Sequence, residues 1–291
     1  MKAILLAGGM GSRLYPVTFG VSKQLLPVYD KPMIYYPLSV LLMANIKEIL
    51  LISTKEDINS YKRLFVDGSQ LGITIEYKVQ DHPNGLAEAF ILGEEFIGED
   101  PVCLILGDNI FYGLDFTEKL EIVVNRTLSE GIGTIFSYPV NDPKRYGVIE
   151  YDNNGNAISI EEKPDDPKSN NVVVGLYFYP NCVIEIAKKI KPSKRGELEI
   201  TSINDYFLKE KKLNVEPLSQ EFIWLDTGTL RSLIDAGQFI ETIEKRKGIK
   251  VACLEELAFQ KGYINKKQLI QSASKMDGTS YGNYLKNKYF K

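Results

Sequence analysis

Short apolar runs alternate with amphipathic stretches through the first half of this 291-residue chain. The runs at 3–6 and 102–106 have the length and continuous apolar character of buried strands, and 48–53 is also strand-like. Stretches with helical spacing of apolar residues, such as 55–65 and 114–128, lie between such runs. This alternation predicts an α/β fold with a mixed, mostly parallel central sheet flanked by helices.

The second half of the chain changes character after residue 139. The segment Asp152-Asn153-Asn154-Gly155-Asn156 separates two apolar runs and is a strong signal for a β-hairpin. Pro32 is expected to open a helix, since proline is favoured in the first helical turn. We also expect a helical C-terminal extension. The remaining predictions are strands at 73–78, 134–138, 147–151, 157–161, 172–179, 213–218 and 222–225, and helices at 32–44, 85–97, 180–189 and 230–246.

Composition excludes several classes of protein. The net charge is −3, without the basic excess expected of a nucleic-acid-binding protein. No segment approaches the ~20 apolar residues of a membrane-spanning helix. Cys103, Cys182 and Cys253 have neither the spacing of a zinc site nor that of a disulfide framework, so they are expected to fill the core. These features indicate a soluble, cytoplasmic protein.

The loop after the first strand, "LLAGGMGSRLYP" over 5–16, is rich in glycine. A glycine loop between a strand and a helix lets backbone N–H groups approach an anion closely. Arg13 adds a fixed fork of donors that suits phosphate oxygens, and Lys23 follows nearby. The loop therefore predicts a phosphate site, whereas a tight turn without a ligand is the alternative. Lys31 lies in the same segment, and we expect it to be a solvated lysine rather than a phosphate ligand.

Two familiar phosphate loops are excluded by the residues present. A P-loop needs Gly-Lys-Ser/Thr at its end, where this chain has Gly11-Ser12-Arg13. A dinucleotide fingerprint beginning at Gly9 needs glycine or alanine at position 14, which is Leu14. The predicted phosphate site is thus of another kind.

The stretch from Leu5 to Leu42 closely resembles the signature of the sugar-1-phosphate nucleotidylyltransferases, and within them that of the glucose-1-phosphate thymidylyltransferases. Further matching stretches follow in the family's order over roughly residues 1 to 240. They are "QDHPNGLAEAF" (80–90), "LILGDNIFYG" (104–113), "RYGVIEYD" (145–152), "EEKP" (161–164), "VVGLYFY" (173–179), "RGELEIT" (195–201) and "WLDTGT" (224–229).

The resemblance implies a Rossmann-like nucleotidyltransferase domain over 1–243, with nucleotide-binding and sugar-binding subregions, and a helical extension over 244–291. It implies transfer of a thymidylyl group from dTTP to glucose 1-phosphate, which yields dTDP-glucose and pyrophosphate. It also implies a Mg²⁺ cofactor and a homotetramer with a regulatory nucleotide site at a subunit interface. Many relatives have Asp and Gln where this chain has Asn84 and Glu88, next to the expected base-recognition turn.

This chemistry needs charge neutralisation rather than a catalytic base, because a phosphate monoester is already mostly dianionic at neutral pH. Arg13 and Lys23 are expected to hold the triphosphate. Asp108 and Asp226 each follow a strand and are expected to bind Mg²⁺, although either aspartate has a turn-forming role as its alternative. The single histidine, His82, is expected to be a loop residue.

Nucleotide and sugar contacts are expected in different parts of the chain. The Gln80 amide can accept from N3–H and donate to O4 of a pyrimidine, which rejects cytosine but does not separate thymine from uracil. The expected nucleotide-binding residues are Leu6, Gly8, Gly9, Gly11, Ser12, Arg13, Gln80, Pro83, Gly85, Leu86 and Gly107. The resemblance implies sugar-phosphate contacts from Asn109, Tyr146, Gly147, Glu162, Lys163, Val173 and Trp224, with Arg195 as a further candidate. Trp224 fits core packing equally well.

Two alternatives remain open from the residues. One is a sister enzyme that uses UTP or another hexose 1-phosphate. The other is a catalytically silent sugar-nucleotide-binding regulatory protein, a reading opposed by the presence of Arg13, Lys23, Asp108 and Asp226.

Overall fold

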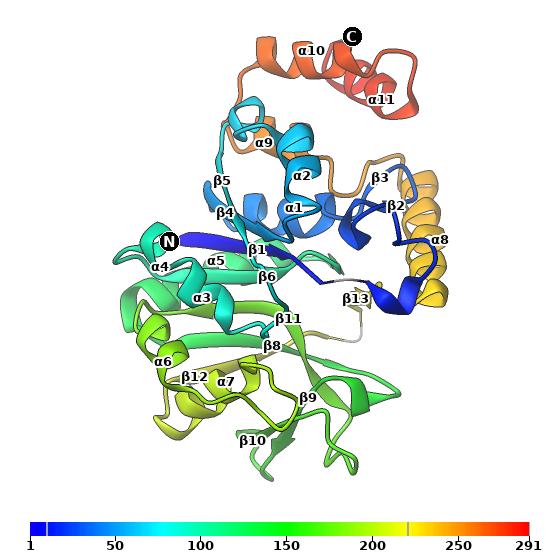
Figure 1. The fold of residues 1–291 in the computed structure, drawn as a ribbon. Coiled ribbons are helices and arrows are strands. Elements are labelled where there is room, and N and C mark those ends of the chain that lie inside the picture. Colours follow the sequence, from blue (N-terminus) through cyan, green and yellow to red (C-terminus); the bar gives the residue numbers. More distant parts are fainter. Residues whose placement is uncertain (10, 220, 291) are drawn as a thin grey trace. The chain divides into compact units, whose positions relative to one another are not determined.

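A computed structural model describes residues 1–9, 11–219 and 221–290. The chain divides into two compact units, each assembled from separate segments. Unit 1 comprises Met1–Leu6, Gln80–Leu106 and Tyr112–Trp224, and unit 2 comprises Ala7–Val79, Gly107–Phe111 and Leu225–Lys291. The path of the chain and its elements can be followed in Figure 1.

A mixed sheet forms the centre of unit 1. Its strands follow the order β10-β9-β11-β6-β1, and β8 pairs with both β11 and β12. The parallel pairs are β1 with β6 and β8 with β12, whereas β11 runs antiparallel to β6, β8 and β9. The strand bounds are β1 Lys2–Ala7, β6 Val102–Leu106, β8 Gly133–Pro139, β9 Gly147–Tyr151, β10 Ala157–Glu162, β11 Asn171–Tyr179 and β12 Leu213–Pro217.

Helices of unit 1 are α3 (Glu88–Leu92), α4 (Glu94–Ile97), α5 (Phe116–Glu130), α6 (Val183–Lys189) and α7 (Ile200–Lys209). Helix α5 packs on β11 and β8, α7 packs on β10 and β12, and α3 packs against α6. Residues 102–105 of β6 and 172–179 of β11 are buried, which explains the continuous apolar runs of these two strands.

Unit 2 combines a parallel strand pair with the C-terminal helices. The strands are β4 (Glu48–Ser53) and β5 (Thr74–Val79), and a short hairpin joins β2 (Pro27–Val28) to β3 (Lys31–Pro32). The helices are α1 Tyr35–Met43, α2 Ile58–Phe65, α8 Leu230–Lys247, α9 Leu254–Gln260, α10 Lys266–Lys275 and α11 Ser280–Tyr289. A separate two-stranded sheet pairs β7 (Asn109–Tyr112) with β13 (Ile223–Asp226).

Local sequence signals explain where α8 begins and ends. Thr229 and Ser232 form a reciprocal capping box at its N-terminus. Gly248 adopts a left-handed conformation at its C-terminus, and Lys245, Arg246 and Lys247 in the last turn complement the helix dipole. Within the described ranges, no helix is both long enough and apolar enough to cross a membrane.

The predicted α/β fold with a mixed sheet flanked by helices and C-terminal helices is confirmed. Three details are corrected. Pro32 lies in the β2–β3 hairpin, and the helix begins at Tyr35. The expected helix over 85–97 begins only at Glu88 and divides at Gly93. Cys182 is exposed rather than in the core, whereas Cys103 and Cys253 are buried as expected. Strand β7 and helix α7 were not predicted.

Candidate active site

The glycine loop of unit 2 turns directly after β1. Gly9 has φ +98° and Gly11 has φ +58°, a region that disfavours other residues. The Gly11 carbonyl accepts from the Leu14 N–H at 2.8 Å and from Thr18 Oγ1 at 2.9 Å. Since nothing lies within 4 Å of a Cβ added at Gly9, that glycine is required by backbone conformation rather than by crowding. Gly8 and Ser12 belong to the same loop.

Lys23 is held at Asp108. Its Nζ lies 2.5 Å from Asp108 Oδ2, and Asn109 Nδ2 donates to Asp108 Oδ1 at 2.8 Å. Burial by itself would raise the pKa of Asp108, but the charge of Lys23 and these hydrogen bonds outweigh that effect. The pKa of Asp108 is therefore held below its ordinary value, and the carboxylate is ionised at neutral pH.

The segment after β13 joins Asp226 to the same group of charges. Buried Thr227 donates from Oγ1 to the Asp108 carbonyl oxygen at 2.8 Å, which places the two aspartate-bearing segments beside one another. A Cβ added at Gly228 would lie 3.0 Å from both Asp226 carboxylate oxygens and 3.1 Å from Arg13 Nη2. Arg13 and Asp226 thus face the same glycine, where a larger residue would intrude.

All four predicted catalytic residues, Arg13, Lys23, Asp108 and Asp226, therefore lie in unit 2, together with Gly107. Asn109 also lies here, bonded to Asp108, rather than in the unit that carries the other predicted sugar contacts. Thr227 and Gly228, which connect the group, were not singled out from sequence, although both belong to the "WLDTGT" stretch.

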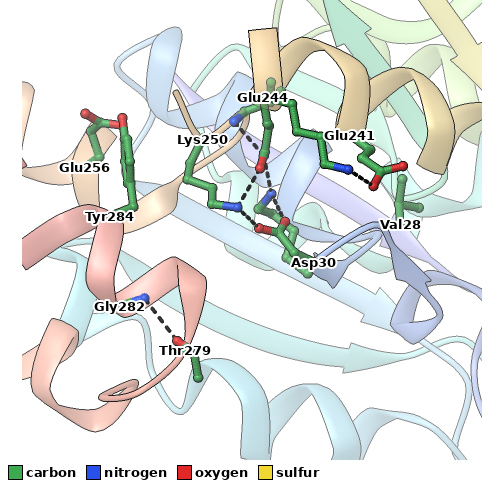
Figure 2. A network of polar contacts seen from close by, with 12 residues as sticks. Val28, Asp30, Glu241, Glu244, Lys250, Glu256, Thr279, Gly282 and Tyr284 are labelled. Atoms are coloured by element: carbon green, nitrogen blue, oxygen red, sulfur yellow. Dashed lines mark hydrogen bonds and ion pairs between the residues drawn. The ribbon is translucent and has the colours of Figure 1, made fainter. Parts of the chain in front are cut away.

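Lys31 is not a solvated lysine. It is 3% exposed and pairs with Asp30 and, at 3.0 Å, with Glu244 Oε1. Lys250 bridges the same two carboxylates, with its Nζ 2.7 Å from Glu244 Oε2, and Figure 2 shows Lys250 beside Asp30 and Glu244. Since its ammonium group is committed to two buried carboxylates, Lys31 belongs to the core of unit 2.

In unit 1, the turn that begins at Gln80 carries the predicted base-recognition residues. Gln80 is 9% exposed, and its Nε2 donates to Glu88 Oε2 at 2.6 Å. Gly85 has φ +109°, and a Cβ there would lie 2.4 Å from the Leu198 carbonyl oxygen, so only glycine fits. Leu86 is half-buried. Of the other predicted nucleotide-binding residues, Pro83 is exposed on this turn, and Leu6 is buried in strand β1.

The predicted sugar-side residues come together elsewhere in unit 1. A Cβ added at Gly147 would lie 3.5 Å from Glu162 Oε2 and 3.7 Å from Val173 Cγ2. Lys163 has a left-handed φ of +46°, its N–H donates to the Tyr146 carbonyl oxygen at 2.9 Å, and its Nζ lies 3.5 Å from Glu162 Oε1. A backbone in this unfavourable region is typical of functional sites.

Aromatic rings and a polar loop border this group. Trp224 is 7% exposed and packs edge-on against Tyr146, with ring centroids 5.4 Å apart. Thr201 donates to Glu162 Oε2, and Arg195 Nη1 lies 3.8 Å from Glu162 Oε1. Thr201 had not been singled out, although it ends the "RGELEIT" stretch.

The nucleotidyl transferase family model matches residues 2–243. The chain belongs to this family. It is 54% identical over 285 residues to the glucose-1-phosphate thymidylyltransferase of Neisseria gonorrhoeae, covering 98% of each protein. It is 53% identical to the protein of the same name from Mycobacterium tuberculosis, again over 98% of each.

Solved structures agree with this assignment. A Bacillus anthracis crystal structure in complex with sucrose, provisionally described as a glucose-1-phosphate thymidylyltransferase, matches with a TM-score of 0.76 and 41% identity. The match covers 82% of this chain and 94% of that one. A UDP-glucose pyrophosphorylase complexed with UDP-glucose has a TM-score of 0.73 at 24% identity, over 83% of this chain and 98% of that one, and supports the fold alone.

Proposed function

We propose that this nucleotidyl transferase moves a thymidylyl group from dTTP to glucose 1-phosphate, releasing pyrophosphate and forming dTDP-glucose. The observation that carries the proposal is the group of charges in unit 2, where Lys23 contacts Asp108 and where Arg13 and Asp226 both lie beside Gly228. Relatives at 53–54% identity are named glucose-1-phosphate thymidylyltransferase, and that name implies these substrates.

In this reaction an oxygen of the sugar phosphate bonds to the α-phosphorus of dTTP. The bond from that phosphorus to the bridging oxygen breaks, and pyrophosphate leaves with the electron pair. The attacking phosphate has a second pKa near ~6, so no side chain has to remove a proton. We assign Arg13 and Lys23 to neutralise the triphosphate and the leaving pyrophosphate. The glycine loop supplies N–H donors for phosphate oxygens.

Magnesium fits the donor set that we assign to it. Asp108 and Asp226 provide hard carboxylate oxygens on segments that Thr227 joins, and Mg²⁺ typically takes one or two carboxylates together with substrate phosphates. When bound, the ion neutralises charge on the phosphate oxygens. The low pKa of Asp108 keeps that ligand ionised at neutral pH.

Unit 1 supplies the residues to which we assign recognition. Gln80, Gly85 and Leu86 would contact the base, whereas Glu162 and Lys163 would contact the sugar hydroxyls and phosphate. We also propose a nucleotidyltransferase domain over 1–243, an extension over 244–291, a homotetramer and a cytoplasmic location. Light scattering after size-exclusion chromatography tests the tetramer.

The central test measures pyrophosphate release from magnesium, glucose 1-phosphate and one nucleotide per reaction, chosen from dTTP, UTP, CTP, ATP and GTP. Fastest release with dTTP is expected. If UTP were an equal or better substrate than dTTP, the proposed reaction would stand but the assigned nucleotide substrate would change to UTP. Folded protein with no release in any reaction would be tested with other hexose 1-phosphates, and failure with all of them would support the silent sugar-nucleotide-binding protein.

A further inference from the structure

Three polar side chains of the turn between β5 and α3 form a chain of hydrogen bonds. Gln80 Nε2 donates to Glu88 Oε2 at 2.6 Å, and Asn84 Nδ2 donates to Glu88 Oε1 at 2.7 Å. Glu88 is the first residue of α3. A single carboxylate therefore receives the amide groups of two residues from the expected base-recognition turn.

The backbone of this turn is held on both sides of Gly85. The Leu198 N–H donates to the Asn84 carbonyl oxygen at 2.7 Å, and the Ala87 N–H donates to the Leu198 carbonyl oxygen at 3.1 Å. With the backbone fixed in this way, the remaining freedom of the turn lies in its side chains. The freedom that matters for base recognition is a half-turn of the Gln80 amide, which exchanges its oxygen and nitrogen.

Glu88 removes that freedom. An ionised carboxylate has only acceptors, so it bonds Gln80 when the amide nitrogen faces it and repels Gln80 when the amide oxygen does. One N–H of Gln80 is thereby committed to Glu88. The carbonyl oxygen and the second N–H remain available to a ligand, in a fixed orientation.

We propose that Glu88 is a positioning residue for base selection: it fixes the Gln80 amide in the orientation that reads a pyrimidine with N3–H and O4. This inference rests on the proposed function, in which Gln80 contacts the base. A reversed amide would offer N–H to the unprotonated N3 of cytosine and its oxygen to the cytosine amino group, so loss of the Glu88 charge would admit cytosine nucleotides.

The test compares kcat/KM for dTTP and dCTP in the wild type and in Glu88→Gln. In the variant, three neutral amides at 80, 84 and 88 can reverse together, so we expect the dTTP-to-dCTP ratio to fall at least tenfold. The change should arise mainly in KM, with kcat for dTTP within about twofold of the wild type. Glu95→Gln makes the same chemical change at an exposed position on α4 and should leave the ratio unchanged.

A rescue variant separates positioning from packing. In Asn84→Asp/Glu88→Gln, the carboxylate introduced at position 84 accepts from the amide nitrogen introduced at position 88. The amide oxygen at position 88 then accepts from Gln80, so the original orientation of Gln80 returns. We expect the selectivity ratio to recover to within about threefold of the wild type.

Two results would overturn the inference: a selectivity ratio unaffected by Glu88→Gln, or one that the double variant does not restore. A wild type that releases no pyrophosphate with dTTP would instead refute the proposed function, and the inference with it.

Discussion

Replacing Glu244 by Gln should destabilise unit 2 strongly, because its carboxylate is 3% exposed and lies between two ammonium groups. One oxygen accepts from Lys31 at 3.0 Å and from the Val251 N–H at 2.9 Å, and the other contacts Lys250 at 2.7 Å. The variant leaves two buried cations to share Asp30. Removal of one partner from a buried ion pair costs about 3–5 kcal/mol, a large part of a total stability on the order of 5–15 kcal/mol.

Urea unfolding followed by circular dichroism measures this change, with the slope m required to match that of the wild type. Glu241→Gln is the matched control, because Glu241 pairs with Lys245 on the exposed side of the same helix, at 2.6 Å (Figure 2). The control should be indistinguishable from the wild type. The reasoning would be refuted if the two variants had equal free energies of unfolding, since burial would then add nothing to the Glu244 pairs.

Four further outcomes are expected. Asp108→Asn should lower pyrophosphate release at least a hundredfold while the circular dichroism spectrum is retained; near-normal turnover would remove Asp108 from the metal site. Arg13→Ala should reduce kcat/KM by at least tenfold without lowering the thermal midpoint, and an unchanged kcat/KM would contradict its phosphate role. Gly85→Ala should raise KM for dTTP, because its Cβ would lie 2.4 Å from the Leu198 carbonyl oxygen, and unaltered kinetics would show that the turn can yield. Burial alone would raise the pKa of Asp30, but bonds from two lysines outweigh it and hold that pKa below its ordinary value. Asp30 therefore stabilises the folded state fully at pH values above the unfolded carboxyl pKa of ~3.9, and this stability is lost as the pH falls through the lower pKa of the folded state. If the acid unfolding curve of Asp30→Asn coincided with that of the wild type, this contribution would be excluded.

Patterns local in sequence predicted most of the fold. The apolar residues that predict β4 and β6 lie within one short segment of sequence each. The hairpin at Asp152–Asn156 is specified by its own turn residues, because the backbone N–H groups of Asn154 and Asn156 donate to Asp152 Oδ1. Helix α3 was predicted too early because the turn around Gly85 is bonded across to the distant Leu198 segment, and a local pattern carries no information about that partner.

The candidate site was proposed from residue types that suit phosphate and metal chemistry. Glycines after a strand and aspartates at strand ends are typical of phosphate and metal sites, and the structure places Lys23 against Asp108. The buried ion pairs of Lys31 could not be predicted from its residue type, because a lysine in a sequence looks the same whether its ammonium group contacts solvent or a carboxylate. Its partner Glu244 lies 213 residues away on α8, a position that the local sequence presents as one more charge on an amphipathic helix. Glu88 stood out in the sequence as a departure from relatives, but its hydrogen bond with the Gln80 amide could not be read there, because that contact exists only in the folded turn.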